Sequence, residues 1–216
     1  MNNKNVIIAN CMQYVSDSIK IILEAQGASV YELREAQNIK ADILICGVGK
    51  MPFACFNKIE EADIEKAVRK NIIYNIKFIR NFIQNMIDKR NGKIICLIPQ
   101  YSSHAVWGTS CISMISGAMK AFIMGLAMDY CKYNIRANCI EYGLGIDENC
   151  LMYDDKSKLN DLQPIKRACV PEDIARATLF LSTDMSAFIS GETIPVNGGA
   201  FCIGHNQVWN NWLNKI

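Results

Sequence analysis

The chain has 216 residues, of which 50% are hydrophobic and 20% charged, and this suits one domain with a sizeable core. Its formal net charge of +2 and its pI near 8.0 are close to balanced, and no run of basic residues stands out. We therefore expect neither a nucleic-acid partner nor binding to a membrane.

Ten cysteines are scattered along the chain without a CxxC pair, and His104 and His205 are the only histidines. This pattern disfavours a metal centre and predicts that most cysteines are small core residues in a reducing compartment. The N-terminal stretch MNNKNVIIAN contains only a very short apolar run, which predicts no signal peptide or anchor. We expect a cytoplasmic protein.

The N-terminal third alternates between strand and helix patterns. Asn5 to Ala9 reads as a buried strand, Ser16 to Gln26 as a helix capped by Ser16 and closed by Gly27, and Ser29 to Leu33 as a second strand. This order of a strand, a turn, a helix and a second strand within about 30 residues predicts the start of a doubly wound nucleotide-binding fold.

The middle of the chain continues the alternation. Ala41 to Gly47 reads as a strand, and Ile59 to Arg90 reads as two helical segments that Gly92 ends. Lys93 to Ile98 is the next buried strand, and it runs into a polar stretch that contains Ser102 and Ser103.

A long apolar segment follows, from Met114 to Tyr130, with apolar residues on every side of the predicted helix. This pattern predicts a helix that is buried all round. Lys120 and Asp129 interrupt the segment, which is too short for a membrane span. Because an unpaired ammonium group in an apolar setting is costly, Lys120 should have a partner.

Two stretches carry a resemblance to a known family. SGAMKAFIMGLAMDYCKYNIRANCIEYG resembles the active-site helix and following strand of the short-chain dehydrogenase/reductase family, in which a YxxxK pair precedes a "gIRvN" phrase and a PG turn. IKRACVPEDIARATLFLSTDMSAFISGETIPVNGGAF resembles that family's C-terminal PEDIA and VDGG region. The resemblance implies one Rossmann-like α/β domain over residues 1–216, a doubly wound parallel sheet, with 144–163 as a lid-like loop and 204–216 as a C-terminal tail.

The resemblance also assigns catalytic positions. Lys120 falls on the family lysine, Ser103 on the family serine and Asn71 on the family asparagine, whereas Ser116 stands at the position of the catalytic tyrosine. A serine hydroxyl is a much weaker acid than a phenol, so general acid catalysis should be largely lost. Ser116 and Lys120 also resemble a serine and lysine hydrolase pair on one helix face, although nothing identifiable supplies an oxyanion hole.

The cofactor positions depart from the family pattern as well. Where the family has the glycines of TGxxxGxG, this chain has Asn10, Tyr14 and Ser16, and Gly49 ends the CGVG stretch that replaces NNAG. These glycines let the backbone approach a pyrophosphate, so side chains here should weaken binding. Tyr14 either covers the pyrophosphate site or is a surface aromatic on a loop with another path.

The second and third predicted strands are separated by only about ten residues, fewer than an ordinary parallel crossover needs. The family normally has a helix, a strand and another helix there, so we expect a sheet that is narrower on the adenine side. Together with the altered loop, this predicts no binding or weak binding of NAD(P).

Two functions follow from the resemblance. The first is a pseudoenzyme that acts through subunit association, as a homo-oligomer or with an active relative. The second is an NAD(P)-dependent oxidoreductase of carbonyls or alcohols with an altered site. Trp209 and Trp212 in the tail either dock on the domain or contact another subunit.

Overall fold

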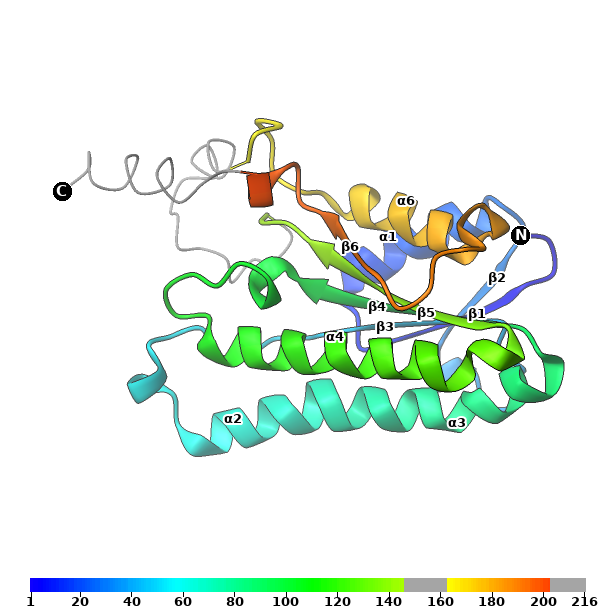
Figure 1. Ribbon diagram of the computed structural model, residues 1–216, viewed down its shortest axis with the longest axis horizontal. Coiled ribbons are helices and arrows are strands. Elements are labelled where there is room, and N and C mark those ends of the chain that lie inside the picture. The colour runs from blue at the N-terminus through cyan, green and yellow to red at the C-terminus, as the bar shows by residue number, and fades with distance from the viewer. Residues whose placement is uncertain (146–162, 203–216) are drawn as a thin grey trace.

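The computed structural model describes residues 1–145 and 163–202. In this part of the chain, six strands form one parallel sheet in the order β2-β1-β3-β4-β5-β6 (Figure 1). The strands are β1 (Asn5–Ala9), β2 (Ser29–Glu32), β3 (Ile43–Gly47), β4 (Gly92–Pro99), β5 (Ile135–Tyr142) and β6 (Thr193–Val196). The predicted doubly wound parallel sheet is therefore confirmed.

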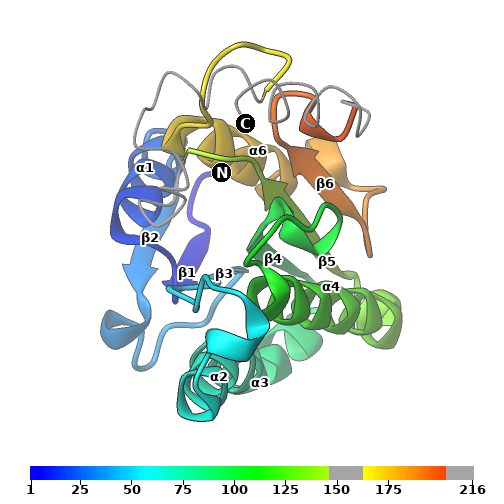
Figure 2. The ribbon, with the colours of Figure 1, turned by 90° about the vertical axis from the view of Figure 1, so that its left-hand side faces the viewer.

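Helices cover both faces of the sheet. Helices α1 (Gln13–Glu24) and α6 (Pro171–Ser182) lie on one face, and α2 (Glu61–Val68), α3 (Tyr74–Lys89) and α4 (Ser110–Tyr130) lie on the other (Figure 2). Each face has its own apolar core, because β3, β4 and β5 are buried on both sides and send alternate side chains to either layer.

The first helix begins earlier than the sequence pattern predicts. Helix α1 starts at Gln13 and its N-cap is Met12, which makes no side-chain capping bond. Ser16 is not the cap: it lies inside the helix, and its Oγ donates to the carbonyl oxygen of Gln13 at 2.9 Å. The loop after β1 is consequently short, and Gly27, with φ +84°, ends the helix as expected.

The sheet is narrow at the β2 edge, as predicted. Only a short 3₁₀ turn, Leu33–Glu35, is found between β2 and β3, and β1 lies between these two strands in the sheet. The chain therefore crosses one strand with a loop in place of the helix, strand and helix of the family pattern. Strand β2 forms the edge of the described sheet.

The predicted helical pair at 59–90 is almost continuous. A π-helical turn, Arg69–Ile73, joins α2 to α3, and α3 ends at Arg90, which adopts a left-handed conformation with φ 49°. Gly92 does not end the helix. It is the first residue of β4, where an added Cβ would lie 2.6 Å from Met86 Sδ, so glycine serves close packing there.

Helix α4 is not buried all round. One side packs on the sheet, but the opposite side leaves Met124 60% and Met128 77% exposed. The segment Ser110–Tyr133 is long and apolar enough to span a membrane by length and composition, and 39% of its most apolar 18-residue stretch is buried. Its packing against β4 and β5 accounts for the apolar inner face, and the outer face remains without a partner in the described chain.

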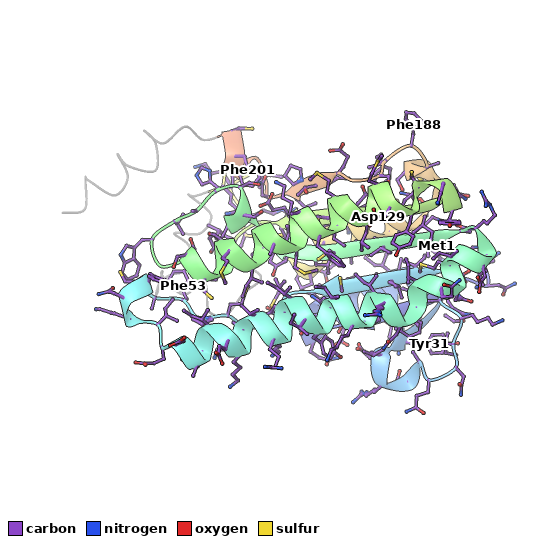
Figure 3. All side chains as sticks on the ribbon, turned by 60° about the horizontal axis from the view of Figure 1, so that its bottom comes forward. Met1, Tyr31, Phe53, Asp129, Phe188 and Phe201 are labelled. Atoms are coloured by element: carbon purple, nitrogen blue, oxygen red, sulfur yellow. The ribbon has the colours of Figure 1, made fainter. Side chains whose placement is uncertain are left out.

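The C-terminal elements are joined by a buried arginine. Arg136 on β5 donates to the carbonyl oxygens of Ile189, Leu181 and Thr183 at 2.9, 3.0 and 3.2 Å. These bonds satisfy carbonyl groups at the C-terminal end of α6 and hold the turn that leads to β6. Phe188 stands fully exposed in this turn and points away from the molecule (Figure 3).

Candidate functional site

The predicted site residues gather at the carboxyl edge of the sheet. Strand order reverses between β1 and β3, because β2 follows β1 on one side while β3 and β4 follow on the other. In open α/β sheets, ligands bind in the crevice outside the carboxyl ends at such a switch point. Two groups of polar residues lie at this edge, one after β1 and β3 and the other after β4 and β5.

The first, which we call the asparagine group, consists of Asn10, Asn71 and Asn75. Asn10 follows β1, and its Nδ2 donates to the carbonyl oxygens of Gly47 at 3.0 Å and Lys70 at 3.1 Å. Asn75 Nδ2 also donates to the Gly47 carbonyl oxygen, at 2.8 Å. The carboxamide of Asn10 thus bridges the end of β1, the end of β3 and the π-helical turn.

Asn10 also explains how the loop turns without a glycine. Its φ of 54° is left-handed, a conformation that asparagine tolerates better than most residues. The loop lies very close to β3, since a Cβ added to Gly47 would be 3.0 Å from Cys11 Sγ and 3.1 Å from the Asn10 carbonyl oxygen. The ends of β1 and β3 are therefore in contact, with the Asn10 side chain between them and the helix.

The other predicted cofactor residues lie around this bridge. Gly49 donates its backbone N–H to Asn71 Oδ1 at 2.6 Å. Tyr14, in the first turn of α1, is 37% exposed and its hydroxyl lies 3.0 Å from Met12 Sδ, so the phenol is held against the loop. Ser16 is buried and bonded within α1, and does not face the crevice as a free donor.

A nicotinamide dinucleotide, the cofactor that the resemblance implies, does not fit these residues in the family's manner. Its pyrophosphate would need open backbone between the end of β1 and the start of α1. Here Asn10 carries a side chain at that point, and its carboxamide is hydrogen-bonded to the end of β3 and to the π-helical turn. The β2 edge also lacks the strand beyond it that the family pattern provides.

The second group, which we call the serine–glutamate group, consists of Ser102, Ser103, Lys120 and Glu141. Lys120 Nζ donates to Ser103 Oγ at 3.1 Å, and Ser103 Oγ donates to Glu141 Oε2 at 2.8 Å. Glu141 Oε1 accepts from Ser102 Oγ at 2.6 Å and from the Ser103 N–H at 3.1 Å. The partner that Lys120 requires is therefore Ser103.

Glu141 was not recognised from the sequence. It is the second-last residue of β5 and is only 1% exposed, in a strand that is buried throughout. A charged residue at the end of an apolar strand, directly before the Tyr142–Gly143 turn, was the available signal. The serines that donate hydrogen bonds to Glu141 lie 38 and 39 positions away in sequence. The contact between Glu141 and these serines could therefore not be predicted.

The four residues predicted to be catalytic are divided between separate places. Ser103 and Lys120 are bonded to each other, whereas Asn71 belongs to the asparagine group and donates its Nδ2 to the Ala67 carbonyl oxygen. Ser116 is fully buried on α4, and its Oγ has no hydrogen-bond partner. The proposed pair of Ser116 and Lys120 is not hydrogen-bonded.

Three further predictions concern a metal centre, the cysteines and the segments near the C-terminus. Within residues 1–145 and 163–202, no group of three histidine, cysteine or acidic side chains is placed to hold a metal ion. Cys46, Cys96 and Cys139 are buried side by side on β3, β4 and β5, as the prediction of core cysteines requires. Most of the lid-like segment and the tail with Trp209 and Trp212 lie outside the described residues.

Comparison with known proteins places this geometry in a family. The family model described as enoyl-(acyl carrier protein) reductase matches residues 21–200. An uncharacterised oxidoreductase of Bacillus subtilis, YmfI, is 28% identical over 170 residues, which cover 74% of this chain and 67% of that protein. The 3-oxoacyl-[acyl-carrier-protein] reductase FabG of Chlamydia pneumoniae is 28% identical over 162 residues, covering 74% of this chain and 65% of FabG.

Solved structures agree on the fold. An oxidoreductase of the short-chain dehydrogenase/reductase family from Burkholderia thailandensis superposes with a TM-score of 0.87 at 18% identity, covering 99% of this chain and 98% of that one. The matched segment spans about two thirds of the length of YmfI and of FabG. On the sheet topology, the family model and these similarities together, the chain belongs to the short-chain dehydrogenase/reductase family.

Proposed function

We propose that this protein does not perform nicotinamide-dependent redox chemistry and acts instead through association with another subunit, either a second copy or an active relative. The bridge made by Asn10 across the switch-point crevice carries the proposal. A cofactor would have to displace a carboxamide that already has two well-formed hydrogen bonds, and each is worth about 0.5–1.5 kcal/mol.

The catalytic side of the site supports the same conclusion. The family chemistry needs a phenol that exchanges a proton with the substrate oxygen, and Ser116 stands in its place. Its hydroxyl is fully buried and unpartnered, so it does not face a substrate. General acid catalysis, typically worth about 10²- to 10⁴-fold, then has no donor at this position.

The exposed face of α4 supports association. Methionines 114, 124 and 128 recur at helical spacing along the outer side and are 46%, 60% and 77% exposed. Gly117 and Gly125 have no atom within 4 Å of an added Cβ, which leaves this side of the helix open and flat. An apolar face of this kind is typical of a surface that another protein covers.

A second candidate is an oxidoreductase with an altered site. The observation that favours it is the direct bond between Lys120 and Ser103, two residues that match the family's catalytic positions. FabG of Chlamydia pneumoniae is named as a 3-oxoacyl-[acyl-carrier-protein] reductase, so a 3-oxoacyl thioester is the substrate class to assay.

Thermal denaturation with and without NADH or NADPH tests the proposal. A ligand present at 100 times its Kd and bound only to the folded protein adds about 2.7 kcal/mol of stability. We expect no change in Tm at millimolar cofactor and no NADPH consumption with a 3-oxoacyl thioester. A clear rise in Tm together with substrate-dependent oxidation would establish the second candidate instead.

Light scattering coupled to gel filtration tests the association. We expect more than one chain per particle, and we expect Met128→Glu to reduce the mass to that of a monomer while the far-UV spectrum is unchanged. Ile21→Glu is a matched control, because Ile21 is 68% exposed but lies on α1, on the opposite face of the sheet. A wild-type monomer at micromolar concentration would contradict self-association through this face.

A further inference from the structure

The serine–glutamate group contains a buried charge for which neither the fold nor the family pattern accounts. Glu141 is 1% exposed, and an ionised carboxylate removed from water needs hydrogen-bond donors. Ser102 Oγ and the Ser103 N–H both donate to Oε1, and this fixes the carboxylate so that Oε2 faces the Ser103 hydroxyl. The carboxylate is therefore oriented by a third group, as a general base must be.

Ser103 lies between two opposite charges. Its Oγ donates a proton to Glu141 Oε2 at 2.8 Å and accepts one from Lys120 Nζ at 3.1 Å. Its proton thus points to an acceptor, while its oxygen lies beside a positive charge. The carboxylate can accept the hydroxyl proton, and the ammonium favours negative charge on the oxygen that remains.

Ser103 is also accessible, which distinguishes it from Ser116. It is exposed to solvent in the turn after β4, whereas Glu141 lies beneath it. A reactive oxygen at the surface, a base below it and a cation at its side form the arrangement of a nucleophilic serine. In the family this serine orients a substrate oxygen by donating a hydrogen bond, and here the Ser103 hydroxyl already donates to Glu141 Oε2.

We propose that Ser103 is a nucleophile that takes the acyl group of small activated esters or thioesters, with Glu141 as the general base and Lys120 as the stabilising cation. Ser103 Oγ forms a bond to the acyl carbon while its proton moves to Glu141 Oε2. The bond from the acyl carbon to the leaving oxygen or sulfur then breaks, and the leaving group takes the proton from Glu141. Water hydrolyses the resulting serine ester by the same steps, which releases the carboxylic acid.

Lys120 has a defined part in this scheme. Negative charge develops on the attacked carbonyl oxygen, close to the attacking Oγ, and the ammonium lies 3.1 Å from Oγ. One positioned donor to such an oxyanion typically contributes about 10²- to 10³-fold. The activity requires no nicotinamide, so it goes beyond the proposed function and does not depend on it.

Reaction of the purified protein with p-nitrophenyl acetate tests the proposal. We expect release of p-nitrophenol, a mass increase of one acetyl group, and peptide mapping that assigns this group to Ser103. Ser103→Ala should abolish the labelling, and Glu141→Gln, which retains the shape of the side chain but cannot take the proton, should slow it about 10²-fold. Ser29→Ala is the matched control, because Ser29 is an exposed serine at the start of β2 and far from Glu141, and its loss should change nothing.

Folding of each variant is followed by its melting temperature. If Glu141→Gln fails to fold, Glu141→Asp replaces it as the test of the general base. This variant keeps a carboxylate but places it farther from Ser103 Oγ, so Ser103 should be acetylated more slowly than in the wild type. Acetylation of Lys120 or of surface lysines in place of Ser103 would overturn the proposal. Equal labelling of Glu141→Gln and the wild type, or no labelling of the wild type, would overturn it as well.

Discussion

The two halves of the sheet's carboxyl edge have diverged from the family pattern in different ways. At β1 and β3, Asn10 stands where the family pattern has a glycine, and its carboxamide joins the loop after β1 to the Gly47 and Lys70 carbonyl oxygens. At β4 and β5, the family serine and lysine remain bonded, and Glu141 adds a buried charge below them. The β1 and β3 half thus holds an added side-chain bridge, whereas the β4 and β5 half keeps the serine and lysine of the family pattern.

The stability of the β5 side should depend most strongly on Arg136. This side chain donates to the Leu181 and Thr183 carbonyl oxygens at the end of α6 and to the Ile189 carbonyl oxygen in the turn before β6. Arg136→Met should lower the free energy of unfolding by about 3–5 kcal/mol, since it leaves buried acceptors unpaired. Urea denaturation measures the change. Arg34→Met, at an exposed arginine beside β2, should change it by less than about 0.5 kcal/mol, and a similar loss in both variants would refute the role of Arg136.

The stability of the β1 side should depend on the Asn10 side chain and, separately, on the left-handed backbone at this residue. Asn10→Ala removes the bridge and places alanine at φ 54°, so we expect a loss of about 2–3 kcal/mol. Asn10→Gly removes the bridge but accepts the backbone conformation, and should cost about 1–2 kcal/mol. Equal stability of the two variants in urea would mean that the left-handed backbone is not retained.

Ser116 is a position at which a substitution should stabilise the protein. Its buried Oγ has no partner, so Ser116→Ala should raise the free energy of unfolding by about 1–2 kcal/mol through removal of an unsatisfied group and better helix propensity. Ser186 is the matched case, since it is equally buried but bonded to Arg136 and to the carbonyl oxygens of 180, 181 and 183. Ser186→Ala should be destabilising, and an opposite order would contradict the hydrogen-bond assignment.

The smallest expected effect concerns the start of α6. The hydrogen bond from Arg167, assisted by the Val170 N–H and opposed by burial, lowers the pKa of Asp173 below its ordinary value of 3.8. The ionised carboxylate is therefore favoured in the folded protein, and its contribution is present above about pH 4 and lost as pH falls through the folded pKa. Tm measured from neutral pH to about pH 3 should converge for wild type and Asp173→Asn at the acid end, and a constant difference would contradict this linkage.

The fold could be predicted largely from local patterns. Apolar runs such as Asn5 to Ala9 matched β1, and Pro171 with its acidic neighbours matched the start of α6, because these signals lie within single elements. The outer face of α4 could not be predicted, since apolar residues on all sides do not reveal which of them the fold leaves exposed. The sequence alone cannot distinguish burial in the chain from burial in an assembly.

The residues of the candidate site could be predicted only where the family pattern gives the spacing between them. Ser103 and Lys120 were paired through the resemblance, and their hydrogen bond is found. Glu141 and the Asn10 bridge depend on contacts between residues 37 to 60 positions apart, which no local periodicity encodes. Both are isolated polar residues at the ends of buried strands, and such a residue is the feature of the sequence that points to a site.

The most direct test of the central claim is a fluorescence titration of wild type and Asn10→Gly with NADPH. The account predicts no saturable binding to the wild type at millimolar cofactor, because the bonded Asn10 side chain stands where a pyrophosphate needs open backbone. Measurable binding that appears only in Asn10→Gly would identify this side chain as the obstacle. Micromolar binding to the wild type would contradict the account.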